Sequence, residues 1–449
     1  MEPTHLSRDS VRRAIDRLKE VGRALAARYP GESSRRQPVH TVYGGAQLFR
    51  SDTTRRLGEL ARRALDEYGP DPQAFGEAIG LSPALRESVY GRVRRKLESE
   101  PVEDFRIDFE DGYGNRPDAE EDGHAASAAQ AVANAMRGGT LPPFIGIRIK
   151  PFSEELSARS IRTLDIFIGA LATATGGRIP PNFVVTLPKV TSADQVSILV
   201  DLLEQLESAL TLASGSLALE IMIETTQSVI DTTGVSAPLK LVAAARGRCV
   251  AAHFGTYDYT AACNITAAHQ VMTHPACDFA KHVMQISLAG TGVWIVDGAT
   301  NIMPVPVHRA PPHRMLSAAE LDENRSAVHR AWRLHVNHVR HSLVNAYYQG
   351  WDLHPAQLPA RYATLYAFFL EGLDEAGERL RNFVGKAAQA TLVGEVFDDA
   401  ATGQGLLNYF LRAVNCGAMS EGEAVEKSGL TLEELRTRSF VEILKKRSR

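Results

Sequence analysis

The sequence predicts an α/β fold, a (β/α)8 barrel of the TIM type with helical insertions and with helical extensions at its N- and C-termini. Short runs of β-branched and aromatic residues alternate with longer Ala- and Leu-rich amphipathic stretches, which is the pattern of βαβ units in a parallel sheet. Eight such runs occur, the number that closes a barrel. A doubly wound open sheet is the alternative, but no GxGxxG follows the first run. The runs are VHTVYG (39–44), FRIDF (105–109), FIGIRI (144–149), FVVTL (183–187), LALEIMI (217–223), VAAHF (250–254), VWIV (293–296) and WDLHP (351–355).

Helical segments flank these runs and connect them. Residues 1–37 are predicted to form an N-terminal helical extension, because apolar residues recur there at helical spacing. The barrel is predicted to span residues 38–360, with helical insertions at about 50–103 and 308–347, and residues 361–449 to form a C-terminal helical extension. Ser192 with Gln195 and Ser317 with Glu320 have the spacing of capping boxes, which begin helices. The apolar positions of the first helix are Leu6, Val11, Ile15, Leu18, Val21 and Leu25.

The composition argues against several classes of protein. The 449 residues are 23% charged and 44% hydrophobic, which is ordinary for a globular protein with a large core. The formal charge of −3 argues against nucleic acid as a partner, because proteins that bind it carry a basic surface. Four cysteines without a CxxC pair are typical of a reduced, cytoplasmic protein. No apolar run approaches the roughly 18 residues that span a bilayer, so no membrane partner is expected.

Charged or small residues follow nearly every predicted strand. In a barrel of this type, the catalytic groups lie at the C-terminal ends of the strands and in the loops that follow them. Any one of these residues has a purely structural interpretation, such as a helix cap, but their recurrence at one end of the barrel indicates a site. They are Asp108, Glu110, Asp111, Arg148, Lys150, Lys189, Glu224, Asp258, Asp297 and His354.

Two of these acids follow adjacent strands and suit a divalent cation. Glu224 and Asp258 would hold Mg²⁺, or Mn²⁺ as the alternative ion, and leave positions for water and substrate oxygens. Arg148 would contact a carboxylate or an enolate oxygen, and the backbone of Gly255 and Thr256 would offer N–H donors. These groups suit a metal-assisted cleavage beside a 2-oxo acid.

The chain resembles the HpcH/HpaI aldolase and citrate lyase beta-subunit family of phosphoenolpyruvate/pyruvate-domain barrels. The resemblance covers residues 104–300 well, and residues 350–358 beyond a long insertion. No single motif is specific, but seven occur in the right order. They are RIDFEDG (106–112), IGIRI (145–149), TLPKV (186–190), IMIETTQSV (221–229), FGTYDYTAA (254–262), GVWIVDGAT (292–300) and GWDLHPAQL (350–358).

The resemblance implies a magnesium-dependent carbon–carbon lyase, and it assigns roles to residues by position. Glu224 and Asp258 match the metal ligands of the family, and Arg148 matches the arginine at the substrate's carbonyl or enolate oxygen. The acids Asp108, Glu110 and Asp111 match a segment near the metal and its waters. Asp108 and Asp111 are expected to be catalytic, with an acid of the 108–111 segment or a bound water handling the proton. Lys189 is expected to bind substrate, and His354, in the family's His-Pro-x-Gln segment, is expected to be a general acid/base or a structural group. The family also implies a homo-oligomer, a trimer or hexamer.

The chain departs from the family at its first strand and at Tyr257, where the family often has an acid. The first strand lacks the early arginine of members that cleave acyl-CoA, which favours a free 2-oxo acid or hydroxy acid slightly over an acyl-CoA substrate. Three other hypotheses stay open. In the first, Lys150 or Lys189 would form a Schiff base in a metal-free aldolase. In the second, the chain would be an inactive or partner-dependent lyase-like subunit. In the third, the enzyme would carry out another enolate chemistry, such as thioester hydrolysis or phosphoryl transfer from phosphoenolpyruvate.

Overall fold

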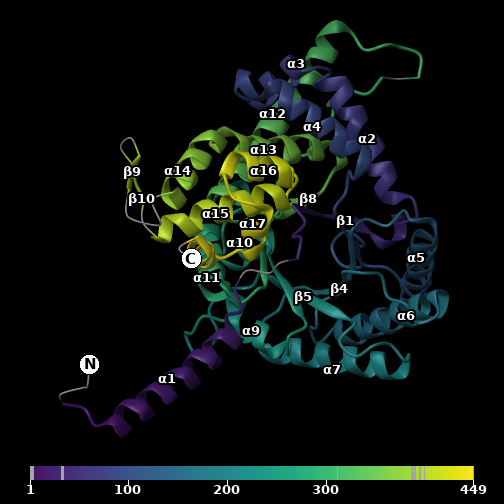
Figure 1. Ribbon diagram of the computed structural model, residues 1–449. Coiled ribbons are helices and arrows are strands. Elements are labelled where there is room, and N and C mark those ends of the chain that lie inside the picture. Colours follow the sequence, from purple (N-terminus) through teal and green to yellow (C-terminus); the bar gives the residue numbers. More distant parts are fainter. Residues whose placement is uncertain are drawn as a thin grey trace.

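Eight parallel strands form one sheet at the centre of the molecule (Figure 1). The computed structural model describes residues 5–31, 35–310, 312–385, 391–393, 396–398 and 400–447. The strands neighbour one another in the order β7-β6-β5-β4-β3-β2-β1-β8, so the predicted (β/α)8 barrel with helical extensions is confirmed. Their bounds are β1 (His40–Gly45), β2 (Asp104–Asp108), β3 (Phe144–Arg148), β4 (Phe183–Leu187), β5 (Ala218–Ile223), β6 (Cys249–Phe254), β7 (Trp294–Val296) and β8 (Gly350–Asp352).

The barrel closes between β7 and β8 through the residues that flank them. The backbone N–H of Asp297 donates to the carbonyl of Gln349 at 2.9 Å, and that of Trp351 donates to the carbonyl of Gly298 at 3.1 Å. The sheet therefore joins its two outer strands, and the C-terminal ends of all eight strands surround one opening.

Helices connect the strands and cover the outside of the barrel. The helices α7 and α12 begin with the capping boxes predicted at Ser192 and Ser317. The expected insertion at 308–347 consists mostly of α12, which forms the connection from β7 to β8, and α13 follows β8. The helices that accompany the strands are α5 (Asp118–Gly138), α6 (Ser157–Thr175), α7 (Ala193–Ala209), α8 (Thr226–Val229), α9 (Pro238–Ala244), α10 (Thr256–Ala262), α11 (Pro275–Leu288), α12 (Ala318–Val344) and α13 (Leu358–Glu371).

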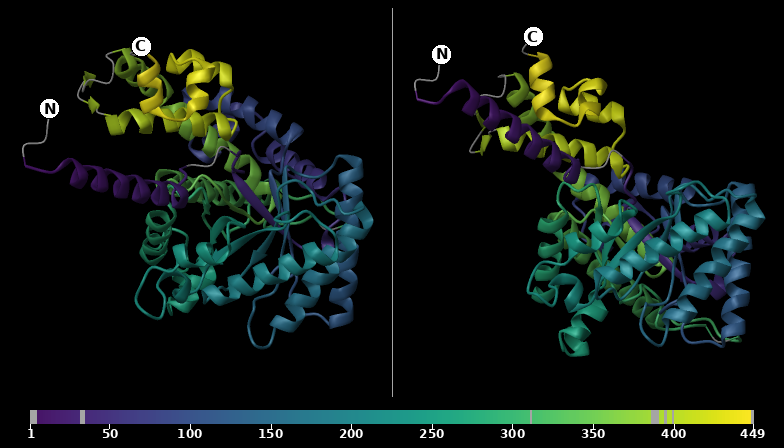
Figure 2. Two further views of the ribbon diagram at one scale, coloured as in Figure 1. Left: turned by 60° about the horizontal axis from the view of Figure 1, so that its bottom comes forward. Right: turned by 90° about the horizontal axis from the view of Figure 1, so that it is seen from below.

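Further helices lie beyond this framework. The segment between β1 and β2 forms α2 (Thr53–Tyr68), α3 (Pro72–Ile79) and α4 (Arg86–Ser99), which pack beside α12 and α13 (Figure 1). At the N-terminus, α1 (Arg8–Arg28) projects away from the body (Figure 2). The C-terminal helices are α14 (Leu373–Gly385), α15 (Ala400–Asn415), α16 (Glu421–Ser428), α17 (Leu432–Thr437) and α18 (Phe440–Arg447).

Two features bear on expectations from the sequence. A short antiparallel hairpin, β9 (Thr391–Val393) and β10 (Val396–Asp398), interrupts the C-terminal helices, and the sequence pattern does not predict it. Within the described part of the chain, no helix combines the length and the apolar character needed to cross a membrane.

The barrel interior contains a buried charged cluster on β2 and β5. Because alternate residues of a barrel strand face inward, Asp104, Arg106 and Asp108 share the inner face of β2. The Arg106 guanidinium binds both carboxylate oxygens of Glu220, at 2.6 and 2.7 Å, and also pairs with Asp104. The side chains of Asp104, Arg106 and Glu220 are at most 3% exposed. Each charge is therefore stabilised by its partners rather than by water.

Replacing Arg106 by Met should therefore destabilise the fold strongly. Two buried carboxylates would lose their shared cation, and breaking such a pair costs about 3–5 kcal/mol. Urea unfolding should show this loss, whereas Arg246→Met, at an exposed pair with Asp201, should change stability by less than about 1 kcal/mol. Equal losses in the two variants would contradict this account of the interior.

Candidate active site

Charged residues from five neighbouring strands meet at the C-terminal end of the barrel. Parallel strands of a barrel all end on one side, so residues far apart in the sequence converge there. Asp108 and Arg148 end β2 and β3, and Glu224 follows β5 directly. Seven of the charged residues that follow the predicted strands are connected here by ion pairs, hydrogen bonds or mutual repulsion: Asp108, Glu110, Asp111, Arg148, Lys189, Glu224 and Asp258.

Asp108 holds Arg148 in a fixed orientation. Arg148 donates from Nε to Oδ1 of Asp108 at 2.7 Å and from Nη2 to Oδ2 at 2.6 Å. The same carboxylate accepts the backbone N–H groups of Glu110 and Gly112. Burial opposes the ionisation of Asp108, but Arg148 and the two N–H donors outweigh it and hold the pKa of Asp108 below its usual value. Asp108 is therefore a positioning group for Arg148, with its oxygens already occupied.

The other sides of Arg148 are also fixed. Its Nη1 lies 2.9 Å from Oε2 of Glu110. The guanidinium lies over the ring of Tyr43, 4.8 Å from the ring centre, and 5.9 Å from the centre of the Trp351 ring. Sequence reasoning gave neither aromatic residue a place at the site, and the one available signal was their position on the first and last strands.

Lys189 lies among the acids of the cluster. Its ammonium is 2.5 Å from Glu110 Oε1, 3.3 Å from Asp258 Oδ2 and 3.6 Å from Asp111 Oδ2. Burial lowers the pKa of Lys189, but the neighbouring carboxylates raise it well above its usual value. A Schiff-base lysine needs a neutral amine, so this environment does not favour that role for Lys189.

The backbone at Lys189 is also shaped by the cluster. The residue has a φ of 49°, in the left-handed region that side chains other than glycine adopt rarely. Its N–H donates to Oε1 of Glu224 at 2.6 Å. Such strained residues concentrate at functional sites, where the surrounding structure holds them in place. The predicted metal ligand thus fixes the loop that carries Lys189.

The ammonium group of Lys150 binds partners outside the acid cluster. It donates to the carbonyl of Phe109 at 2.6 Å and lies 3.0 Å from Oε2 of Glu121 on α5. Both partners are buried. Lys150 therefore ties the loop after β2 to α5 rather than offering a free amine at the site.

Glu224 and Asp258 form the acid pair on which a metal ion would depend. Glu224 is 2% exposed, and burial together with repulsion from Asp258 and Glu110 raises its pKa to about 8. A bound cation would relieve that repulsion and ionise the carboxyl group. Among the described residues no group of three or more His, Cys, Asp or Glu side chains is arranged as a metal site. Mg²⁺ commonly binds one or two carboxylates together with waters and substrate oxygens, so this pair fits it.

Gly255 provides the space that Glu224 occupies. A Cβ on Gly255 would lie 2.3 Å from Oε2 of Glu224, closer than any real contact. Gly255→Ala should therefore displace the carboxylate and weaken Mg²⁺ binding at least about 10-fold, as changes beside metal ligands do. Isothermal titration with Mg²⁺ measures this, and Gly169→Ala, on α6 with open space around it, serves as the control. Unchanged Mg²⁺ affinity in Gly255→Ala would contradict the placement of the metal.

Two further residues predicted for the site are Thr256 and His354. Thr256 is 1% exposed, and its Oγ1 is buried without a hydrogen-bond partner among the described residues. Nδ1 of His354 accepts the N–H of Ala356 at 3.2 Å and so caps the short helix η4 (Pro355–Gln357). The contacts described for His354 are local to this turn and do not connect it to the acid cluster.

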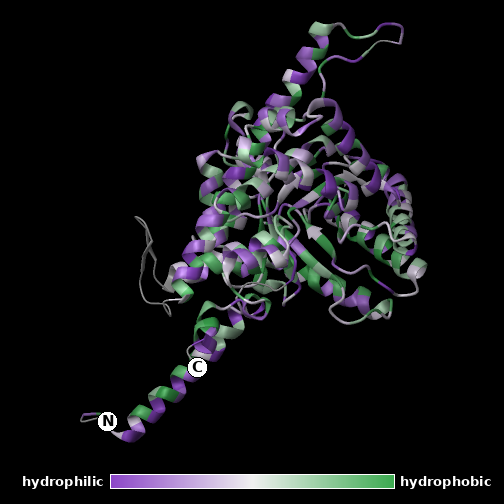
Figure 3. Cartoon of the chain, turned by 45° about the horizontal axis from the view of Figure 1, so that its top comes forward, coloured by the Kyte–Doolittle hydropathy of each residue, from purple (hydrophilic) through white to green (hydrophobic). Residues whose placement is uncertain are grey.

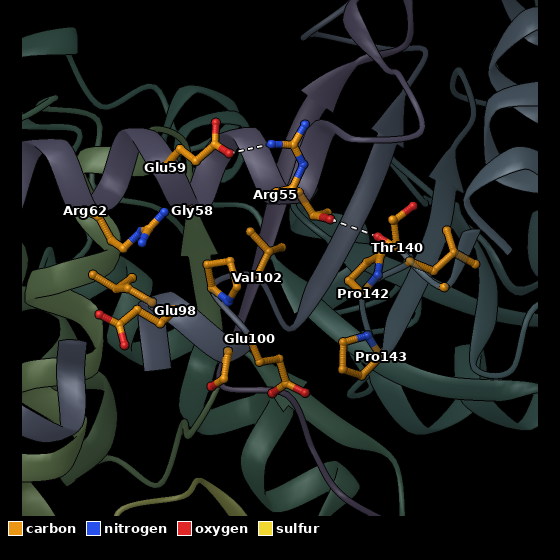
Figure 4. Close-up of a pocket in the computed structure, with 16 residues that line it drawn as sticks. Arg55, Gly58, Glu59, Arg62, Glu98, Glu100, Val102, Thr140, Pro142 and Pro143 are labelled. Atoms are coloured by element: carbon orange, nitrogen blue, oxygen red, sulfur yellow. Dashed lines mark hydrogen bonds and ion pairs between the residues drawn. The ribbon is translucent and has the colours of Figure 1, made fainter. Parts of the chain in front are cut away.

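A cavity of about 400 Å³ lies at the opposite end of the barrel (Figure 4). It is lined by α2, by the end of α4 and by residues 139–143, which precede β3. Arg55 and Glu59 pair at its margin at 2.5 Å. Because its walls precede β2 and β3, this cavity is separate from the acid cluster.

The chain is similar to known structures at low sequence identity. A citrate lyase from Burkholderia xenovorans LB400 is 17% identical with a TM-score of 0.55, over 88% of this chain and 97% of the other. A malate synthase from Haloferax volcanii, solved with glyoxylate, is 15% identical with a TM-score of 0.46, over 90% and 98% of the two chains. No curated protein matches the sequence. Residues 18–443 match one family over most of the chain, and the protein therefore belongs to the family described as Domain of unknown function (DUF6986).

Proposed function

We propose that the protein is a magnesium-dependent carbon–carbon lyase of the aldolase or citrate lyase kind. It would cleave or form the bond next to a 2-oxo acid or an acyl-CoA enolate. The observation that carries this proposal is the pairing of two acids suited to Mg²⁺, Glu224 and Asp258, with the buried cation of Arg148 at one end of the barrel. The ordered motifs that resemble those of the citrate lyase beta-subunit family support it, as does the barrel in common with a citrate lyase.

Glu224 and Asp258 would hold Mg²⁺, with Mn²⁺ as the alternative ion. When bound, the ion would draw electrons from the carbonyl and carboxylate oxygens of a pyruvate-like unit. Arg148 donates N–H bonds to the oxygen on which negative charge develops as the carbon–carbon bond breaks. Since Asp108 and Tyr43 already fix the guanidinium, little reorganisation is needed as that charge appears.

Glu110 is the acid best placed to carry the proton. Burial raises the pKa of Glu110 even though Arg148 and Lys189 oppose the shift. A carboxyl group with a raised pKa exchanges protons more readily near neutral pH. Asp111 is 64% exposed at the mouth of the site, where it would contact water or the far end of a substrate. Lys189 would orient the substrate carboxylate.

Metal removal tests this function directly. The purified chain alone should cleave a 2-oxo acid aldol or an acyl-CoA substrate in a panel that follows pyruvate, oxaloacetate or enolate release. EDTA should abolish that activity and Mg²⁺ should restore it. Activity that survives EDTA and is lost with borohydride plus substrate would instead establish a Schiff-base aldolase. Activity that needs a second protein would establish the partner-dependent subunit.

A further inference from the structure

The N-terminal helix α1 makes no buried contact with the part of the chain that the structure describes. It is 21 residues long, about 31 Å at 1.5 Å per residue, and none of its residues is buried. It projects from the body in every view (Figures 1 and 2). Isolated helices of this length are marginal in water, and most helices are stabilised by packing of an apolar face. The helix therefore lacks the contact that would stabilise it.

One face of α1 carries the apolar residues needed for such a contact. Val11, Ile15, Leu18, Gly22 and Leu25 are spaced alternately by four and three residues, the pattern of a helix that packs lengthwise against a partner. Ile15, Leu18 and Leu25 are 45%, 69% and 58% exposed. Apolar and polar residues alternate along the projecting helix in Figure 3.

The charges of α1 indicate what kind of surface this face meets. The helix has seven basic and three acidic residues, a net +4, within a chain of net −3, so the rest of the chain carries −7. At 100° per residue six of the seven basic residues lie on the two sides of the apolar face, whereas Arg13 and the acidic residues lie opposite it. Two copies of α1 side by side would therefore repel each other, whereas an acidic body would attract the helix. The flanking residues are Arg8, Arg12, Lys19 and Arg23 on one side and Arg17 and Arg28 on the other.

The body of the chain carries an exposed apolar surface beside the base of α1. We call it the α11 patch: Ile230, Val235, Phe279, Ile286 and Val344, which are 37–77% exposed. Two hydrogen bonds join its elements. One lies between the hydroxyls of Ser236 and Ser287, 2.7 Å apart, and in the other the Gln285 side chain donates to the carbonyl of Asn345 at 3.1 Å. Beyond the end of α11, the N–H of Gly31 donates to the carbonyl of Gly290 at 2.8 Å. The α11 patch therefore lies beside the C-terminal end of α1.

We propose that α1 is an exchanged arm, whose apolar face packs on the α11 patch of a second copy of this chain. An arm that is anchored next to its own receptor surface can be exchanged reciprocally, because one symmetry operation places each arm on the other copy's patch. The proposal joins the two unpartnered apolar surfaces and sets a basic arm against an acidic body. It does not depend on the proposed lyase activity.

The mass of the 449-residue chain in solution tests the proposal. At about 10 µM, a concentration at which a micromolar complex is mostly assembled, light scattering should give at least twice the 49.0 kDa of one chain. The arm variant Leu18→Asp/Leu25→Asp and the patch variant Ile286→Asp should each give 49.0 kDa. The control variant Ala24→Asp/Ala27→Asp adds the same charge on the polar face of α1 and should keep the oligomer.

Several outcomes would overturn the proposal. A monomeric wild-type chain would do so, with or without co-sedimentation on vesicles of anionic lipid, which would instead identify α1 as a membrane-surface helix. An arm variant that stays oligomeric would also overturn it, as would a patch variant that keeps the wild-type mass while the arm variant dissociates. Circular dichroism of each variant should retain the helical signal of the body, which separates loss of assembly from loss of folding.

Discussion

Glu224→Gln should lower metal-dependent turnover at least about 100-fold, because losing a metal ligand costs more than losing a residue that only supports one. The amide is nearly isosteric and keeps an oxygen that can accept the N–H of Lys189, which Glu224 now accepts at 2.6 Å. It cannot supply the negative charge that pairs with Asp258 around a cation. Steady-state rates at saturating Mg²⁺ measure the loss, and Glu204→Gln, an exposed position on α7, is the matched control.

The same substitution should stabilise the metal-free protein at high pH. The pKa of Glu224 is raised from 4.5 to about 8, first by burial and then by Asp258 and Glu110. Between these two values the folded chain keeps a proton that the unfolded chain releases. Stability of the metal-free wild type therefore falls as the pH rises through this window, by at most about 1.4 kcal/mol per pH unit from this one group. Glutamine does not titrate, so the variant should show a smaller fall.

Thermal melting in EDTA at pH 5 and pH 9 tests whether the stability of the metal-free wild type falls, relative to the variant, as the pH rises. The melting temperature of Glu224→Gln relative to wild type should be higher at pH 9 than at pH 5. Full catalytic activity in Glu224→Gln would show that Glu224 is not a ligand of a catalytic metal ion. A relative melting temperature that does not rise with pH would show that Glu224 is ionised in the metal-free fold.

The eight strands of the barrel could be predicted because each is buried on both faces. Such strands appear as short runs of apolar and β-branched residues, and periodicity along the connecting helices separates them. The last strand is the instructive difference. The sequence suggested 351–355, whereas β8 ends at Asp352. The backbone N–H groups of Leu353 and His354 donate to the Gln357 side chain instead of a neighbouring strand, which ends the strand early.

The pairing of side chains within the site could not be predicted in the same way. Asp108 and Arg148 face each other because the register of β2 and β3 places their Cα atoms side by side, and a single sequence does not specify register across strands. Lys189 lies among the acids because its backbone turns into the left-handed region after β4. The motifs therefore indicated candidate residues. The proposed roles, Asp108 as a positioning group for Arg148 and Glu110 as a proton carrier, depend on contacts that only the structure gives.

Arg148→Lys should lower kcat about 100–1,000-fold while changing KM much less, the loss seen when one donor to a developing oxyanion is removed. Lysine keeps the charge but not the planar fork. It cannot bind both oxygens of Asp108, reach Glu110 and lie flat over Tyr43 at once, as the guanidinium does. The ammonium would remain paired with Asp108 and would withdraw from the position where negative charge develops.

The matched control is Arg162→Lys on α6, where an arginine also donates to both oxygens of an aspartate, Asp122, but lies 61% exposed. Its kcat should equal that of wild type. Mg²⁺ affinity should be nearly unchanged in Arg148→Lys, because Glu224 and Asp258 remain. Loss of Mg²⁺ binding together with kcat would mean that Arg148 supports the metal ligands. Unchanged kcat would mean that another group stabilises the developing charge; Lys189 is the other cation of the cluster.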